Sequence, residues 1–306
     1  MQDGSRKAII AAFGANLGIA VSKFAGFLVT GSAGLAAESV HSLADTGNQG
    51  LLLLGSKRAT RERDDDHPFG HQRERYFWGF IVALVLFSMG GLFALYEGIQ
   101  KILHPHETES LGIAVVILVV AIVLETLSLR TAVKETAHVK PAGMSYWRFI
   151  RTAKQPELPV VLLEDVAAEL GLFIALAGVL LGHFTHEPRW DAAGSVAIGI
   201  LLIVVAFILA TEMKGLLMGE TASEDHKKAL LDSLRSHPMV RRVVYMHTEH
   251  LGPDAVLVAA KVIFDPDVHA DVVSRSIDEA EGAMRAAVPI ARFIFIEPDM
   301  QRPQVH

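Results

Sequence analysis

The chain has 306 residues, of which 51% are hydrophobic, and it carries a formal net charge of −6 and a mean hydropathy of +0.36. This composition is too apolar for an ordinary soluble domain, and the negative charge argues against nucleic acid as the main partner. Because the chain contains no cysteine, disulfide bonds, thiolate zinc sites and a cysteine nucleophile are excluded. We expect no cleavable signal peptide, since the first apolar run is longer than a signal core.

Six stretches of the sequence are long and apolar enough to cross a bilayer, which takes about 20 residues in a helix. They lie near residues 8–29, 34–54, 78–100, 111–133, 159–182 and 192–213. The third contains small residues such as Gly90 and Gly91, which let neighbouring helices approach closely. The sequence therefore predicts an all-α bundle of six transmembrane helices in residues 1–218.

Basic residues are distributed unevenly between the links that join these stretches. The second-to-third and fourth-to-fifth links are rich in lysine and arginine, whereas the first-to-second link is only "GSAG" and the fifth-to-sixth holds only Arg189. Lysine and arginine prefer cytoplasmic loops. We therefore expect both basic links and both termini in the cytoplasm. The short loops favour a bacterial inner membrane, with an organellar membrane as the alternative.

After Met218 the pattern changes to that of a small α+β domain, predicted to occupy residues 219–306 in the cytosol. "SEDHKKALLDSLRSHP" and "HADVVSRSIDEAEGAMRAAVP" have the pattern of amphipathic helices. "RRVVYMHTEHLGP" and "DAVLVAAKVIFDPD" predict strands joined by a Gly-Pro turn, and "ARFIFIEPD" predicts a third strand. The order α-β-β-α-β is typical of a ferredoxin-like domain.

The second apolar stretch carries a stripe of polar residues. Since a helix advances about 100° per residue, these residues share roughly one third of the circumference. They are Glu38, His41, Asp45, Asn48 and Gln49. His41 and Asp45 are four residues apart, so their side chains lie one above the other and can share one cation. Ionisable groups inside a membrane usually face a bundle interior or a water-filled route.

The fifth apolar stretch offers three carboxylates, from Glu164, Asp165 and Glu169. Asp165 and Glu169 share one face, and Glu164 lies about 100° away. Two such helices can surround a divalent cation with nitrogen and oxygen ligands. Two alternatives stay open. The polar groups can form a hydrogen-bonded network that only fixes packing, or a carboxylate can pair with a base such as Lys23, for which Glu125 is a further candidate.

Four stretches together resemble a known family. They are "TGSAGLAAESVHSLADTGNQ", "DDDHPFGHQRERYFW", "YEGIQKILHP" and "LGPDAVLVAAKVIFD". In combination they resemble the cation diffusion facilitator family, and the resemblance covers nearly the whole chain. It implies a homodimeric membrane transporter, not an enzyme, that exports a divalent metal, commonly zinc, in exchange for protons.

The resemblance implies that His41 and Asp45 are the metal ligands of the second span. In the fifth span the family's zinc branch has a His-x-x-x-Asp pair. If Asp165 matches its aspartate, the histidine position holds Val161, which cannot bind a metal. The remaining ligand must then come from Glu169 or Glu164. Such an oxygen-rich site leaves Mn²⁺, Fe²⁺ and Co²⁺ open beside Zn²⁺.

The resemblance also implies a second metal site, formed by Asp64, His67 and His71 in the link before the third span. Pro68 and Gly70 exclude an unbroken helix, so these ligands would converge through a turn. The alternative is a helix-start turn, with the arginines at 73 and 75 anchoring the third span at the lipid headgroups.

The terminal domain matches the family's metal-binding members poorly. Two positions that can be histidine there fall on Val244 and Ala260, while Glu297 and Asp299 fall near the remaining ones. We therefore expect this domain to serve dimerisation, with metal sensing as the alternative.

Two other functions are weighed against transport. A non-transporting regulatory membrane subunit is one, because Val161 replaces a usual ligand. A membrane metalloenzyme using His41, Asp45, Asp165 and water is the other, although the sequence offers no nucleophile and no glycine-rich phosphate loop.

Overall fold

The computed structural model describes residues 3–104, 111–265 and 268–299, with only the backbone described at 3–16, 33 and 34. The chain divides into two compact units. The helical unit comprises Met1–Lys57 and Arg75–Lys214, and the sheet unit comprises Arg58–Glu74 and Gly215–His306. The segment between the second and third predicted spans thus belongs to the same unit as the terminal domain. The two chain ends, which the sequence predicts to be cytoplasmic, lie outside the described residues.

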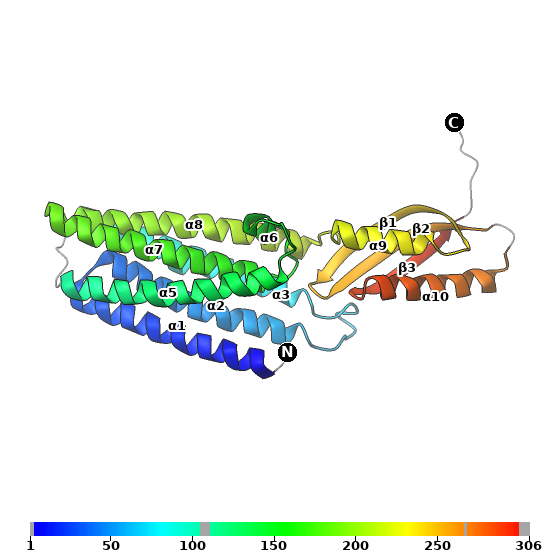
Figure 1. Ribbon diagram of the computed structural model, residues 1–306, viewed down its shortest axis with the longest axis horizontal. Coiled ribbons are helices and arrows are strands. Elements are labelled where there is room, and N and C mark those ends of the chain that lie inside the picture. Colours follow the sequence, from blue (N-terminus) through cyan, green and yellow to red (C-terminus); the bar gives the residue numbers. More distant parts are fainter. Residues whose placement is uncertain (1–2, 105–110, 266–267, 300–306) are drawn as a thin grey trace, which may run out of the picture. The chain divides into compact units, whose positions relative to one another are not determined.

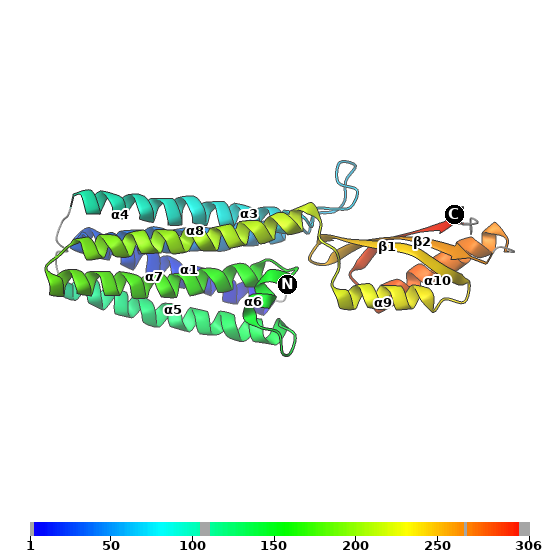
Figure 2. The same ribbon diagram turned by 90° about the horizontal axis from the view of Figure 1, so that it is seen from above.

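The helical unit is a bundle of long helices that run side by side (Figures 1 and 2). They are α1 (Asp3–Thr30), α2 (Ala33–Arg58), the continuous rod α3 (Glu74–Val85), η1 (Leu86–Leu92) and α4 (Phe93–Leu103), then α5 (Leu111–Val139), α7 (Glu157–Thr185) and α8 (Arg189–Met218). Each of the six predicted stretches is helical, and most of the helices extend a few residues beyond it. A short helix, α6 (Tyr146–Thr152), lies between α5 and α7 and was not predicted.

Three helical stretches of the described residues are long and apolar enough to cross a membrane. They are Glu74–Leu103, Leu111–Val139 and Arg189–Met218. Helices α2 and α7 are of similar length, with 26 and 29 residues, but they contain the polar stripe and the three carboxylates. The helices that carry the predicted ligands therefore combine apolar residues with several ionisable ones, as expected of helices whose polar face points into a bundle.

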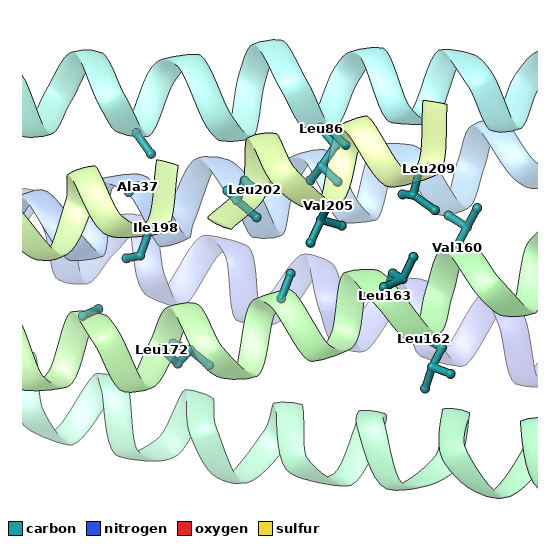
Figure 3. Close-up of a cluster of buried hydrophobic side chains, with 14 of the residues drawn as sticks. Ala37, Leu86, Val160, Leu162, Leu163, Leu172, Ile198, Leu202, Val205 and Leu209 are labelled. Atoms are coloured by element: carbon teal, nitrogen blue, oxygen red, sulfur yellow. The ribbon is translucent and has the colours of Figure 1, made fainter. Parts of the chain in front are cut away.

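The core of the helical unit lies where α2, η1, α7 and α8 face one another, and Figure 3 shows buried side chains such as Leu86, Leu172 and Leu202 there. Between helices in lipid, association depends on close packing rather than on the hydrophobic effect. Glycines provide that packing between α4 and α8. A Cβ atom at Gly98 would lie 2.8 Å from the backbone nitrogen of Val196. The predicted close approach at the small residues of the third span is confirmed.

The middle of the third span is a seven-residue π-helix, η1, in which Leu86, Gly90 and Gly91 are buried. π-helices are rare, and they often occur at functional sites. The apolar pattern of the sequence did not predict this change in helix type.

The sheet unit has the predicted order α-β-β-α-β. Its elements are α9 (Glu224–Arg235), β1 (Val240–Gly252), β2 (Ala255–Phe264), α10 (Ala270–Ala287) and β3 (Ala291–Asp299). Strands β1 and β2 form an antiparallel hairpin, and β3 pairs parallel to β2 after the crossover through α10. Both helices cover the same face of the sheet (Figure 2). Leu230, Leu234 and Met284 of these helices are fully buried in the core, so the predicted α+β domain is confirmed.

Candidate metal sites

The polar stripe of α2 faces the interior of the helical unit. Glu38, His41 and Asn48 are fully buried and Asp45 is 9% exposed, whereas Leu43 on the opposite side of the helix is 50% exposed. The helix therefore turns its apolar side outward and its ionisable side inward, which is the arrangement expected of a helix in lipid.

His41 and Asp45 form a close pair, with 3.4 Å between Nε2 of the imidazole and Oδ2 of the carboxylate. Neither ring nitrogen of His41 has a hydrogen-bond partner among the described residues, and the same holds for Oδ1 of Asp45. The π-helix passes beside the ring, because a Cβ atom at Gly90 would lie 3.9 Å from Nδ1. A buried polar group without a hydrogen-bond partner is costly. The unsatisfied atoms of this pair are therefore suited to bind a metal cation.

The three carboxylates of α7 are held by neutral donors from other helices. The side-chain amide of Asn48 donates to Oε1 of Glu164 at 2.7 Å, which links α2 to α7. The hydroxyl of Ser128 on α5 donates to Asp165 at 3.1 Å, and that of Thr126 donates to Glu169 at 2.8 Å. Glu164 and Asp165 are buried.

The structure does not gather the predicted bundle ligands into one closed shell. Among the described residues, one group of three or more histidine or acidic side chains has all its ligand atoms within 4.8 Å of one another, and it contains none of the bundle residues. The structure joins His41 to Asp45 and Asn48 to Glu164, while Asp165 and Glu169 turn toward α5. Val161, at the position of the expected histidine, packs against the apolar core.

The buried base Lys23 contacts acidic groups that lie outside α7. Its ammonium donates to Glu38 at 3.2 Å and to the hydroxyl of Ser42 at 2.7 Å, and it lies 3.8 Å from Glu125. The suggested pairing with Glu125 is therefore present, and the partner missed by the sequence analysis is Glu38. The position of Glu38 on the polar stripe of α2 was the sequence feature that could have indicated this pairing.

The group whose ligand atoms converge is the predicted loop trio. Nδ1 of His67 lies 2.9 Å from one oxygen of Asp64, and Nε2 of His71 lies 3.1 Å from the other. A turn brings them together, with the amide of Gly70 donating to the carbonyl of His67. Gly70 has a φ of 86°, which glycine adopts without steric cost. The expected convergence of these three side chains through a turn is confirmed.

Hydrogen bonding favours the ionised form of Asp64 in this loop site. The side chain of His67, and after it the backbone amide of His67 and the His71 ring, hold the pKa of Asp64 below its usual 3.8, while burial opposes the shift. The Asp64 carboxylate is therefore ionised at neutral pH and able to accept a cation.

Side chains of this loop contact residues of strands β1 and β3. Phe69 packs edge-on against Phe293 of β3 with ring centroids 5.1 Å apart, and the guanidinium of Arg63 lies 4.6 Å from the same ring. Arg73 pairs with Glu249 of β1.

Arg75 pairs with Glu157 of α7 at 2.6 Å. Arg73 and Arg75 thus each have a carboxylate partner, and the alternative in which they anchor the third span at the headgroups stays a prediction.

In the terminal domain, the two acidic positions that were candidates for metal sensing lie beside one lysine. Lys261 of β2 lies 3.1 Å from Glu297 and 3.9 Å from Asp299. The hydrogen bond and charge of Glu297 raise the pKa of Lys261. These carboxylates therefore already have a cationic partner.

Residues 9–218 match the family model described as "Cation efflux transmembrane domain". The human "Proton-coupled zinc antiporter SLC30A9, mitochondrial" is 36% identical over 261 residues, which are 85% of this chain and 45% of that protein. "Metal tolerance protein C4" of Arabidopsis thaliana is 29% identical over 262 residues, 85% of this chain and 57% of that protein.

"Cation-efflux pump FieF" of Escherichia fergusonii is 26% identical over 280 residues, 90% of this chain and 87% of that protein. The chain thus spans about half the length of the first two relatives and most of the third. The family model covers more than two thirds of the chain, including the whole helical unit from residue 9 on. The chain therefore belongs to the cation efflux family, which is the cation diffusion facilitator family that its motifs resemble.

Proposed function

We propose that the protein exports divalent metal cations, with zinc as its main cargo, in exchange for protons. The observation that carries this proposal is His41. It is a fully buried imidazole whose two nitrogens lack hydrogen-bond partners among the described residues, one helical turn from Asp45 inside a cation efflux domain. A structural histidine would normally be satisfied by a neighbour, whereas a ligand histidine keeps a nitrogen for its metal.

The names of the relatives support transport over the enzymatic alternative. They describe a proton-coupled zinc antiporter and a cation-efflux pump. Imidazole and carboxylate together suit Zn²⁺, and the additional carboxylates of α7 allow Mn²⁺, Fe²⁺ or Co²⁺ to compete.

We assign the transported metal to His41, Asp45 and Asp165, with Glu164 or Glu169 as the fourth ligand in place of Val161. Asp165 is held by the single neutral hydroxyl of Ser128. A hydrogen bond from a hydroxyl to an ionised carboxylate contributes about 1.5–3 kcal/mol, which a metal–carboxylate bond outweighs. The carboxylate therefore swings from α5 toward the His41–Asp45 pair when the cation arrives.

Proton exchange follows from the same ligand atoms. A carboxylate binds metal when ionised and an imidazole binds it when neutral, so metal and protons compete for each site. Cytoplasmic metal displaces protons from these residues, and protons from the other side displace the metal after the bundle reopens.

The loop trio of Asp64, His67 and His71 is proposed as a second metal-binding position, on the cytoplasmic side. The protein acts as a homodimer whose sheet unit supplies contacts between protomers. Its proposed location is a bacterial inner membrane with both termini in the cytoplasm, although one relative is named as mitochondrial.

The test is Zn²⁺ uptake into vesicles that contain the purified protein and have an acidic interior. Wild-type protein should accumulate Zn²⁺ and lose this activity when the pH gradient is removed. Asp45→Ala should reduce uptake to the level of empty vesicles, while Asp278→Ala, which removes an exposed carboxylate of α10, serves as the matched control. Full uptake by Asp45→Ala would refute the ligand assignment. No uptake by folded wild-type protein would favour the regulatory-subunit alternative.

A further inference from the structure

A second cluster of buried polar side chains in the helical unit surrounds the ammonium group of a lysine. Lys23 of α1 is fully buried, and three side-chain oxygens surround its ammonium group. These are Oε2 of Glu38 at 3.2 Å, Oγ of Ser42 at 2.7 Å and Oε1 of Glu125 at 3.8 Å. They come from α2 and α5, so one cationic atom connects three helices.

This arrangement has the form of an occupied cation position. An ammonium group offers three donors, and here it meets three oxygens, two of them from carboxylates. The cluster also contains a spare oxygen, because Oε1 of the buried Glu38 has no hydrogen-bond partner among the described residues. Gly171 of α7 makes room for that oxygen, since a Cβ atom there would collide with it.

The charges of the cluster do not balance with lysine alone. One ammonium faces the carboxylates of Glu38 and Glu125, whose full ionisation leaves one negative charge. Removing the ammonium would leave two carboxylates and a hydroxyl without a counter-ion in a low-dielectric interior, which is strongly unfavourable. A single divalent cation neutralises two carboxylates, and oxygen ligands suit hard cations such as Mn²⁺.

We propose that Lys23 is a tethered cation that fills a second, oxygen-only cation position in the bundle, and that loss of its charge lets a hard divalent cation occupy the space between Glu38, Ser42 and Glu125. The ligands of this position are distinct from His41, Asp45 and the α7 carboxylates. Lys23 thereby keeps Glu38 and Glu125 from competing for the cargo metal. The inference concerns binding and does not depend on the proposed direction or proton coupling of transport.

The test measures Mn²⁺ bound per chain by equilibrium dialysis of the full-length protein in lipid nanodiscs. All variants carry Asp45→Ala and Asp64→Ala, so that the two other proposed sites are weakened equally. Lys23→Ala should bind about one additional Mn²⁺ per chain, because one divalent ion balances two carboxylates. Lys23→Arg, which keeps the positive charge, and the triple change Lys23→Ala with Glu38→Gln and Glu125→Gln should not.

Lys101 provides a matched control. It is a second buried lysine of the helical unit, and its ammonium contacts the carbonyl oxygen of Gly31 at 2.7 Å and the Asp191 carboxylate at 3.0 Å. Because one carboxylate instead of two contacts its ammonium among the described residues, Lys101→Ala should gain no Mn²⁺.

Folded Lys23→Ala protein that binds no more Mn²⁺ than its parent would overturn the proposal. So would an equal gain in Lys101→Ala or in the triple variant. If Lys23→Ala is unstable without metal, its thermal unfolding is measured with and without Mn²⁺. Stabilisation by Mn²⁺ that is absent in the triple variant supports the proposal, and failure to fold even with Mn²⁺ present contradicts it.

Discussion

The bundle pair and the loop trio contain the same ligand chemistry in opposite environments. In the loop, Asp64 and His67 are about half exposed, and the three side chains are already joined by hydrogen bonds. In the bundle, His41 is fully buried and Asp45 nearly so, and the carboxylates that would complete the shell are hydrogen-bonded to hydroxyl or amide groups of other helices.

This difference shows how the free-energy cost of leaving ligand atoms without a partner depends on their surroundings. In the loop, water can solvate the ligand atoms, so the trio can stay assembled with or without a cation. In the bundle, each unsatisfied buried polar group costs about 1–3 kcal/mol, so ligands remain separate where other donors can hold them. A site that binds and releases a metal in each transport cycle is stabilised in its metal-free state when its ligands have such alternative hydrogen-bond partners. We therefore expect the bundle pair to govern transport and the loop trio to govern retention of a cytoplasmic metal.

The largest expected effect comes from removing one histidine of each site. His41→Ala should reduce proton-driven Zn²⁺ uptake into vesicles to background, because the bundle has no other imidazole among the predicted ligands. His71→Ala should lower the amount of Zn²⁺ bound at equilibrium but keep a measurable rate of uptake. The two variants are compared at equal amounts of reconstituted protein.

If His71→Ala loses uptake as completely as His41→Ala, the proposed difference between the two sites is wrong. In that case the loop trio would be part of the transport route. Equal binding of Zn²⁺ by His71→Ala and wild-type protein would instead remove the loop from the list of metal sites.

A smaller effect is expected from restoring the residue that the family's zinc branch has in the fifth span. Val161→His adds an imidazole one turn before Asp165 on α7, and imidazole favours Zn²⁺ over Mn²⁺. The ratio of Zn²⁺ to Mn²⁺ uptake should rise by about tenfold, which corresponds to about 1.4 kcal/mol of differential binding. The measurement is competition between the two ions in the vesicle assay, with Val166→His, an outward-facing position on the same helix, as control. An unchanged ratio would show that position 161 does not reach the cargo.

The sequence was informative where the pattern is local. Spacing of four residues placed His41 over Asp45, and the family resemblance, together with the turn residues Pro68 and Gly70, placed Asp64 near both loop histidines. Partners distant in sequence were not predictable in the same way. Such contacts depend on helix rotation and side-chain rotamers, which no local spacing determines. Examples are the hydrogen bond from Lys23 to Glu38, the packing of Phe69 on Phe293 and the hydrogen bond from Ser128 to Asp165. The π-helix likewise leaves no signature in the apolar pattern.

The smallest effect concerns the charge of the loop site. The side chain of His67 is the main cause that holds the pKa of Asp64 below 3.8, so His67→Ala should raise that pKa toward its ordinary value. Because the folded-state pKa is depressed, the contribution of Asp64 to stability is present above about pH 3.8 and is lost as the pH falls through the lowered value. Carboxyl-carbon NMR of selectively labelled protein follows the titration, and Asp278→Ala supplies the control. If His67→Ala leaves the midpoint of Asp64 in place, the imidazole does not organise the carboxylate, and the preassembly that distinguishes the loop from the bundle would have to come from the backbone turn alone.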